Sequence, residues 1–221
     1  MEKLNAENRA LFLLCTIVAF IVLVPLLEGK QLGEFFLVVS LFLTLVAATL
    51  EVGGKRGGVL WSVAIPAGIA MILIVLDYAL KTRLTLVASH LILAVFMGIV
   101  VARLFSYLGK PGEITNGRLY VSVSLYFLLG IFWFSVFTFL NAVWPGSYAE
   151  SGMTLGARVD TSKLLYFSLA TLTTLGYGDI VAVRPTARIL ATMEAATGVL
   201  FMAITVARLV AAQQTATQER R

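Results

Sequence analysis

Residues 160–179 read DTSKLLYFSLATLTTLGYGD. Asp160 and the two hydroxyl residues after it form a plausible helix N-cap. The apolar stretch that follows, Lys163 to Thr174, is too short to cross a bilayer, which takes about 20 helical residues, and it runs directly into Gly176-Tyr177-Gly178. Non-helical backbone at membrane depth is tolerated only where it lines a protein-walled or water-filled cavity. We therefore predict a re-entrant loop, in which a short helix enters the membrane and the chain then turns back.

The rest of the chain consists mainly of long apolar runs. Of the 221 residues, 59% are apolar and only 13% are charged, whereas a soluble domain carries about 25% charged residues. We therefore predict an all-α membrane protein with six transmembrane helices in addition to the re-entrant segment. The predicted spans are Ala10 to Leu27, Phe35 to Leu50, Val59 to Val75, Leu84 to Val101, Leu119 to Val143 and Ile189 to Ala212.

The first apolar run is interpreted as a retained membrane helix rather than a signal peptide. It is longer than the roughly 7–15 apolar residues of a signal sequence, and no cleavage site of small residues follows in Glu28 to Gln31. Cys15 is the only cysteine, so no intrachain disulfide can form. The net charge of +5 comes from basic residues scattered through short loops, so we expect no nucleic-acid partner.

The basic residues also suggest an orientation. With the N-terminus placed in the cytoplasm, the cytoplasmic flanks of the six spans hold more Lys and Arg than the outer flanks. Six spans also require both termini on the same side. We therefore expect a multi-pass protein of the cell (inner) membrane, in contact with membrane lipids and with both termini cytoplasmic.

The loop from Thr174 to Gly178 has the composition needed to strip water from an ion. Rings of backbone carbonyls at closely spaced levels can replace a hydration shell. Pointing successive carbonyls toward one axis requires alternating dihedrals that glycine adopts most cheaply, which accounts for Gly176 and Gly178. Thr174 adds a hydroxyl at the inner mouth, and Tyr177 can point away and wedge the loop against neighbouring helices. One such loop does not enclose a pore, so we expect a homotetramer.

The stretch from Thr171 to Asp179 resembles the signature of tetrameric potassium channels, with Leu175 where valine or isoleucine is more usual. Gly198 lies 20 residues after Gly178 and matches the hinge glycine of the inner helix in simple potassium channels. The first four spans resemble the voltage-sensor-like half of the six-transmembrane, voltage-gated-like cation channels of prokaryotic type only in number and placement. The resemblance implies a pore helix and a filter that binds K+ through Thr174, Leu175, Gly176 and Tyr177, and that ends at Gly178.

The resemblance also assigns roles to residues around the filter. Tyr166 and Phe167 would form an aromatic cuff that braces it, although both are also compatible with a lipid-facing surface. Asp179 would lie just outside the filter and could accept a hydrogen bond from Tyr166. Ala170 occupies a position where some relatives carry a glutamate, so we expect no inactivation based on a carboxylate pair there.

Glu194 is a carboxyl group within the last predicted span. An ionisable residue inside a membrane is a functional candidate by default. Burial would favour its protonated form, so Glu194 could make the pore respond to pH. The alternative is a static hydrogen bond to a hydroxyl such as that of Ser168 or Thr171, which would support the filter.

The gate is expected below the filter. Gly198 leaves a soft point in the last span, and three apolar residues follow at helical spacing, which could line the cavity and form a dewetting gate: Met202, Val206 and Val210. Helix–helix packing is the alternative role for each of them.

The fourth span argues against a voltage sensor. Such a sensor needs about 3–4 gating charges per subunit, yet Leu84 to Val101 contains no Lys or Arg. His90, the only titratable residue within this span, is either a pH sensor or a packing hydrogen-bond partner. Asp77 is expected to pair with Lys81 at helical spacing.

Together these observations predict a potassium-selective channel that conducts K+ passively and is not strongly voltage-gated. The alternative is a weakly selective monovalent cation channel. We expect no enzymatic activity and no cofactor other than the permeant ion. The predicted domains are a voltage-sensor-like unit over residues 1–108, a linker over 109–118 and a pore domain over 119–221.

Overall fold

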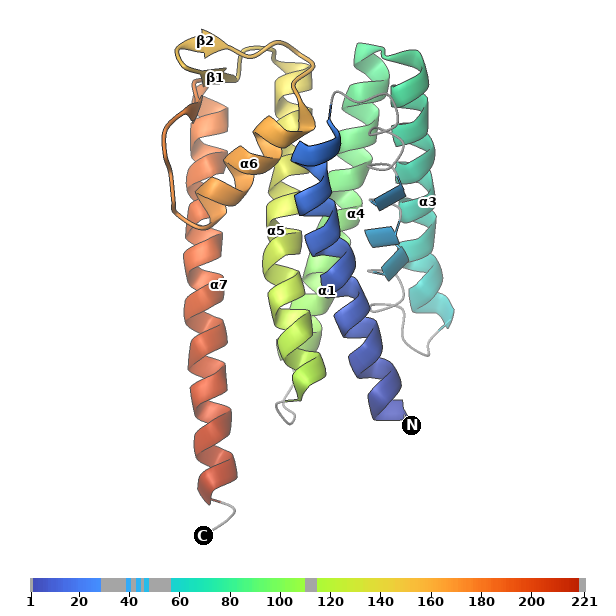
Figure 1. Ribbon diagram of the computed structural model, residues 1–221, viewed down its shortest axis with the longest axis vertical. Coiled ribbons are helices and arrows are strands. Elements are labelled where there is room, and N and C mark those ends of the chain that lie inside the picture. The colour runs from blue at the N-terminus through green and yellow to red at the C-terminus, as the bar shows by residue number, and fades with distance from the viewer. Residues whose placement is uncertain are drawn as a thin grey trace.

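The computed structural model describes residues 2–28, 39–40, 43–44, 46–47, 57–109 and 115–218, and side chains within them for 7–28, 39–40, 43–44, 46–47, 64–109 and 115–208. The described part is mostly helical (Figure 1). Its helices are α1 (Glu2–Leu27), α3 (Gly57–Leu80), α4 (Arg83–Gly109), α5 (Asn116–Val143), α6 (Thr161–Leu172) and α7 (Pro185–Gln218). Its strands are β1 (Tyr148–Glu150), β2 (Met153–Thr154) and β3 (Ile180–Ala182).

Four of the described helices are long and apolar enough to cross a membrane. They are Glu7–Leu27 of α1, Arg83–Gly109, Asn116–Val143 and Pro185–Arg208 of α7. Ala64–Leu80, the part of α3 whose side chains are described, is a shorter apolar helix. The predicted span from Phe35 to Leu50 lies mostly outside the described residues. The protein is therefore a multi-pass, mostly helical membrane protein.

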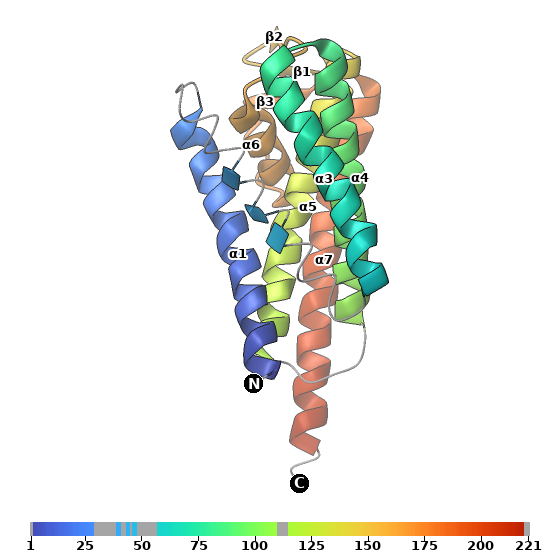
Figure 2. The same cartoon turned by 90° about the vertical axis from the view of Figure 1, so that its right-hand side faces the viewer.

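Helix α5 forms the centre of the molecule (Figures 1 and 2). It packs against α1, α4, α6 and α7. Helix α1 buries a stripe of side chains spaced by three or four residues, as expected for an amphipathic helix: Leu13, Ile17, Phe20 and Val24. Helix α7 leaves large apolar side chains exposed in the single chain, among them Val199, Leu200, Met202 and Val206.

The prediction of an all-α fold was wrong at the end of the molecule where α5 and α6 are joined. A small antiparallel sheet of order β2-β1-β3 forms there. It pairs β1 with β2 as a hairpin and β1 with β3, so that Tyr148 lies opposite Ala182 and Glu150 opposite Ile180. Gly146 and Gly152 turn the chain with positive φ values of 81° and 84°. The strands are two or three residues long, too short for an alternating pattern to stand out.

The expected pair between Asp77 and Lys81 was also wrong. Asp77 binds Arg158 of the α5–α6 connection at 2.6 and 3.2 Å, and its carboxylate accepts a hydrogen bond from Thr85 at 2.7 Å. Lys81 follows the last residue of α3 and has a left-handed φ of 49°. Because Lys81 is not helical, its side chain does not follow the i, i+4 geometry; its Nζ lies 5.7 Å from the ring centre of Tyr78.

Helix α4 is joined to α5 by packing and by hydrogen bonds. Arg83 donates to the carbonyl oxygens of Ala142 and Val143 at 2.9 and 2.6 Å, and so caps the end of α5. Nδ1 of His90 lies 3.1 Å from the carbonyl oxygen of Leu86, and its ring meets Phe134 of α5 edge-on. These contacts agree with the packing interpretation of His90, and the pH-sensor interpretation stays a prediction.

Candidate ion-conduction site

The short helix of the re-entrant segment is α6, which begins at Thr161 and ends at Leu172. Sequence patterning placed it two residues later, from Lys163 to Thr174. Asp160 occupies the N-cap position as predicted, but its side chain makes no capping hydrogen bond. Leu164, Leu165 and Ser168 of α6 are buried. The helix contacts α5 and α7. The carbonyl group of its last residue, Leu172, lies against Tyr126 of α5 and Gly198 of α7, which places the loop that follows at a defined position.

The loop after α6 has the alternating backbone expected of a filter. Residues Thr174, Gly176 and Gly178 have positive φ values of 57°, 52° and 80°. The left-handed region is open to glycine but costs a β-branched residue such as Thr174 of order 1–3 kcal/mol. The strain at Thr174 therefore has to be held in place by the surrounding contacts.

Those contacts centre on the carbonyl oxygen of Ala170. It accepts hydrogen bonds from the amides of Leu175 at 2.8 Å and Gly176 at 3.2 Å, while the amide of Thr174 donates to the carbonyl of Thr171 at 3.0 Å. The last turn of α6 thus binds the first three residues of the loop directly. A displacement of α6 will move the loop with it.

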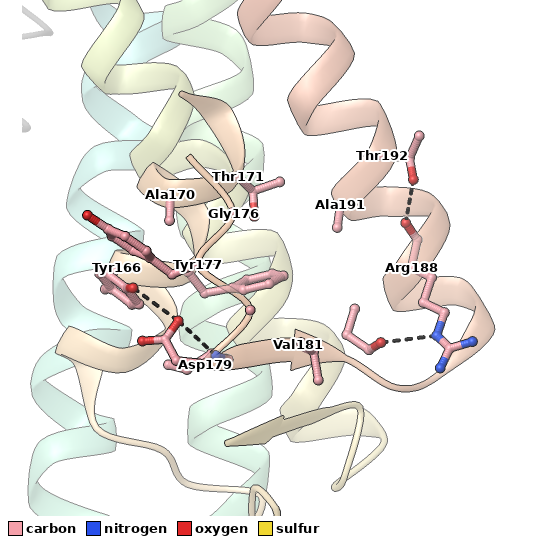
Figure 3. A pocket seen from close by; sticks show the side chains of 14 residues that line it. Tyr166, Ala170, Thr171, Gly176, Tyr177, Asp179, Val181, Arg188, Ala191 and Thr192 are labelled. Carbon is pink, nitrogen blue, oxygen red and sulfur yellow. Dashed lines mark hydrogen bonds between the residues drawn. The ribbon is translucent and has the colours of Figure 1, made fainter. Parts of the chain in front are cut away.

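The C-terminal end of the loop is anchored through Asp179. Its carboxylate accepts hydrogen bonds from the hydroxyl of Tyr166 and from the amide of Ile180, both at 3.0 Å. The Tyr166 bond confirms the partner expected for Asp179 (Figure 3). The carbonyl oxygen of Asp179 also accepts from the amide of Ser151 at 3.2 Å. Since Ile180 begins β3, which pairs with β1, the small sheet ties the C-terminal end of the loop to the α5–α6 connection.

Phe167 faces the protein interior. Its side chain is 7% exposed, and its ring lies 5.3 Å from that of Phe137 and 5.2 Å from that of Tyr148. A lipid-facing position is therefore wrong for Phe167 within the chain. Tyr166 and Phe167 also line a pocket of about 350 Å³ beside the loop, together with Tyr177 and residues at the start of α7 such as Arg188 and Thr192 (Figure 3).

Glu194 is fully buried between α6 and α7. Its Oε1 lies 2.5 Å from the hydroxyl of Ser168, which also lies 2.7 Å from the carbonyl oxygen of Gly130 in α5. One hydroxyl hydrogen cannot serve both acceptors, and a carbonyl oxygen cannot donate. Both bonds form if Ser168 donates to Gly130 and a protonated Glu194 donates to Ser168. The predicted hydrogen bond to Ser168 is confirmed, whereas the pH response stays a prediction.

Gly198 lies at a close approach between α6 and α7. A Cβ added there would overlap the carbonyl oxygen of Leu172 and lie 3.0 Å from its carbonyl carbon. The same carbonyl accepts a hydrogen bond of 3.4 Å from Tyr126 of α5. Helix α7 continues through this position from Pro185 to Gln218. Packing against Leu172 therefore requires glycine here, and the hinge role stays a prediction.

The other gate candidates lie further along α7. Met202 and Val206 are about half exposed, at 50% and 53%. Val210 lies in the helix, but its side chain is outside the described ones. Among the described residues, no cluster of three or more His, Cys, Asp or Glu side chains could hold a metal ion.

Comparison with known families covers the same region. Residues 121–214 match a family model described as "Ion channel". This segment is an ion-channel domain. It comprises most of α5, the sheet, α6, the loop and most of α7, so the match is to a channel family and not to an enzyme. Comparisons with curated proteins and with solved structures found no match.

Several contacts made by the channel domain were missed from the sequence. Ser151 binds Asp179 from a hairpin turn, and Lys163 donates at 2.8 Å to Glu150 at the end of β1, which raises the pKa of Lys163. Glu28 reaches the start of α6 from the far end of α1. Their partners are 13 to 134 residues away along the chain, and no local sequence pattern predicts such pairs.

Proposed function

We propose that the chain is one subunit of a homotetrameric potassium-selective channel that conducts K+ passively. The observation that carries the proposal is the backbone of the loop, in which left-handed residues 174, 176 and 178 alternate with Leu175 and Tyr177. In four copies around one axis, this alternation would direct successive carbonyl oxygens of Thr174, Leu175, Gly176 and Tyr177 to the centre. Rings of carbonyls can replace the hydration shell of K+.

The surface of the single chain favours assembly. Leu175 and Tyr177 are 55% and 71% exposed, although their loop is held on one side by α6 and on the other by the sheet. The exposed apolar residues of α7 extend the same unpartnered surface. Apolar surface beside a polar backbone loop requires protein rather than lipid as its neighbour. Three further copies of the chain supply that neighbour around a four-fold axis.

The gate is proposed to lie in α7 and not to depend strongly on voltage. Gly198, Met202, Val206 and Val210 are the gate candidates, with Gly198 as the hinge. Arg83 at the start of α4 donates hydrogen bonds to carbonyl oxygens at the end of α5, and no Lys or Arg follows until Arg103. We place both termini in the cytoplasm, and α1 begins at the end of the bundle where α7 finishes (Figures 1 and 2).

The proposed division of the chain is a voltage-sensor-like unit over residues 1–108, a linker over 109–118 and the pore domain over 119–221. Helix α4 reaches Gly109 and α5 begins at Asn116, which is compatible with it. The inner membrane is the proposed location.

A weakly selective cation channel is the second candidate, because Leu175 places a longer side chain behind the filter than valine would. The test is K+ efflux from liposomes that contain the purified chain, compared with Na+ efflux. Gly176→Ala is the control, since its φ of 52° strains any other residue. We expect K+ efflux that this variant abolishes. Equal Na+ and K+ efflux supports the second candidate, and no efflux contradicts both.

A further inference from the structure

The first turn of α6 receives its cap from a distant part of the chain. The amide of Ser162 donates to the two carboxylate oxygens of Glu28, at 3.1 and 3.3 Å. The local candidate is occupied elsewhere: a carboxylate oxygen of Asp160 lies 3.6 Å from Nζ of Lys163, and Asp160 caps nothing with its side chain. The first amides of a helix have no partner within it. At Ser162 that partner is Glu28.

Glu28 is held in place by α1. It follows Leu27, the last residue of the helix, and its amide donates to the carbonyl oxygen of Val24 at 3.1 Å. Val24 is fully buried in the hydrophobic core, and α1 packs on α5. The carboxylate therefore sits on a helix end that is fixed against the core, and it is itself half-buried.

The opposite end of α6 carries the filter loop. The helix has 12 residues, which makes it a rod of about 18 Å at 1.5 Å per residue. Its carbonyl at Ala170 holds the amides of Leu175 and Gly176. Displacement of the first turn is thus transmitted along the rod to the loop whose strained Thr174 depends on these contacts.

We propose that Glu28 is a positioning residue for the selectivity filter, through which α1 in the first half of the chain holds the pore helix and keeps the filter in its conducting geometry. This inference rests on the proposed function. The first half then acts on conduction through a hydrogen bond to α6, without gating charges. The negative charge also suits the positive end of the α6 dipole.

The experiment compares wild type, Glu28→Ala, Glu28→Gln and Asp160→Asn in planar bilayers. The loss of a cap changes an equilibrium by about fivefold. We expect Glu28→Ala to lower single-channel open probability by about that factor at unchanged unitary conductance. Raised external K+ should restore it, because ion occupancy stabilises the conducting filter. Glu28→Gln keeps an acceptor oxygen and should be intermediate. Asp160→Asn is the matched control and should behave as wild type.

Two results overturn the inference. One is a fall in the number of channels with unchanged open probability, which indicates a purely structural role for Glu28. The other is a lower open probability in Asp160→Asn together with an unchanged open probability in Glu28→Ala, which makes Asp160 the cap.

Hydrogen exchange separates the inference from the proposed function. If wild type conducts no K+, the proposed function fails, but amide exchange still tests the contact. Faster exchange in residues 161–164 and in the loop 174–178 of Glu28→Ala, and not of Asp160→Asn, supports positioning by Glu28. Unchanged exchange in the loop contradicts it.

Discussion

The side chains of Ser168 in α6 and Glu194 in α7 meet at 2.5 Å, and both residues are fully buried. The second partner of Ser168, the carbonyl of Gly130, lies in α5. One hydroxyl therefore links three helices of the channel domain. The remaining carboxyl oxygen of Glu194 has no hydrogen-bond partner among the described residues, which agrees with a neutral acid rather than a buried charge.

Glu194→Gln should therefore be tolerated. The glutamine amide can donate to Ser168 as the carboxylic acid does, so we expect thermal stability of the assembled channel within about 1 kcal/mol of wild type. Glu194→Ala removes the donor and leaves a cavity, and should cost about 2 kcal/mol or more. Melting of the purified assembly in detergent measures both. If Glu194→Gln lowers the stability as much as Glu194→Ala, the charge of Glu194 matters and the carboxyl group is not protonated as inferred.

The pH dependence of open probability is a second test of Glu194. If this carboxyl is the pH sensor considered above, wild type should respond to pH and Glu194→Gln should not. Identical pH profiles in the two proteins would leave Glu194 with its structural role alone.

Gly198→Ala separates packing from hinge motion. A Cβ at this position overlaps the carbonyl of Leu172, so we expect α7 to be displaced from α6 and the melting temperature of the assembly to fall. If glycine served only as a hinge, alanine would stabilise the helix by up to about 1 kcal/mol while reducing channel opening. Gly68→Ala in α3 is the matched control, since a Cβ there meets nothing within 4 Å. A melting temperature raised equally in both variants contradicts the packing account.

The anchor at Asp179 predicts an order among three variants. Asp179→Ala removes the acceptor of two hydrogen bonds, Tyr166→Phe removes one donor, and Asp179→Asn keeps an acceptor oxygen for both. We expect resistance of the assembly to heat to fall most in Asp179→Ala, less in Tyr166→Phe and least in Asp179→Asn. The measurement is melting at low and high K+. An equal effect of Asn and Ala would mean that the charge, and not the hydrogen bonds, anchors the loop.

The ion pair between Asp77 and Arg158 links α3 to the α5–α6 connection. Because 42% of the Arg158 side chain is exposed, a double-mutant cycle with Asp77→Asn and Arg158→Gln should give a coupling of about 1 kcal/mol or less, weakened by salt. The same cycle with Lys81→Gln in place of Arg158→Gln should give none. A coupling between Asp77 and Lys81, and none between Asp77 and Arg158, would show that Lys81 is the partner of Asp77, as the helical spacing predicted.

Local patterns predicted most of the channel domain. The apolar runs placed the spans, and the short run into Gly176-Tyr177-Gly178 placed α6 within two residues of its observed ends. The Tyr166–Asp179 bond was expected from the family resemblance, and the Ser168–Glu194 bond was one of two roles considered for Glu194. The spans and the short helix are encoded within a few helical turns, where periodicity and turn chemistry determine the geometry.

The features that were missed depend on contacts between distant segments. Glu28 and Ser162 are 134 residues apart in sequence, and Asp77 and Arg158 are 81 apart. Strands β1 and β3 have three residues each and pair across the whole of α6. Neither pairing nor partner choice can be predicted before the helices are packed, because the geometry of these sites is created by that packing.

The most direct test of the central claim is the reversal potential of the purified, reconstituted channel with K+ on one side of the bilayer and Na+ on the other. We predict a potential close to the K+ equilibrium limit, lost together with all current in Gly176→Ala. A reversal potential near zero would mean that Na+ passes as readily as K+, and would contradict the assignment of residues 174–178 as a potassium filter.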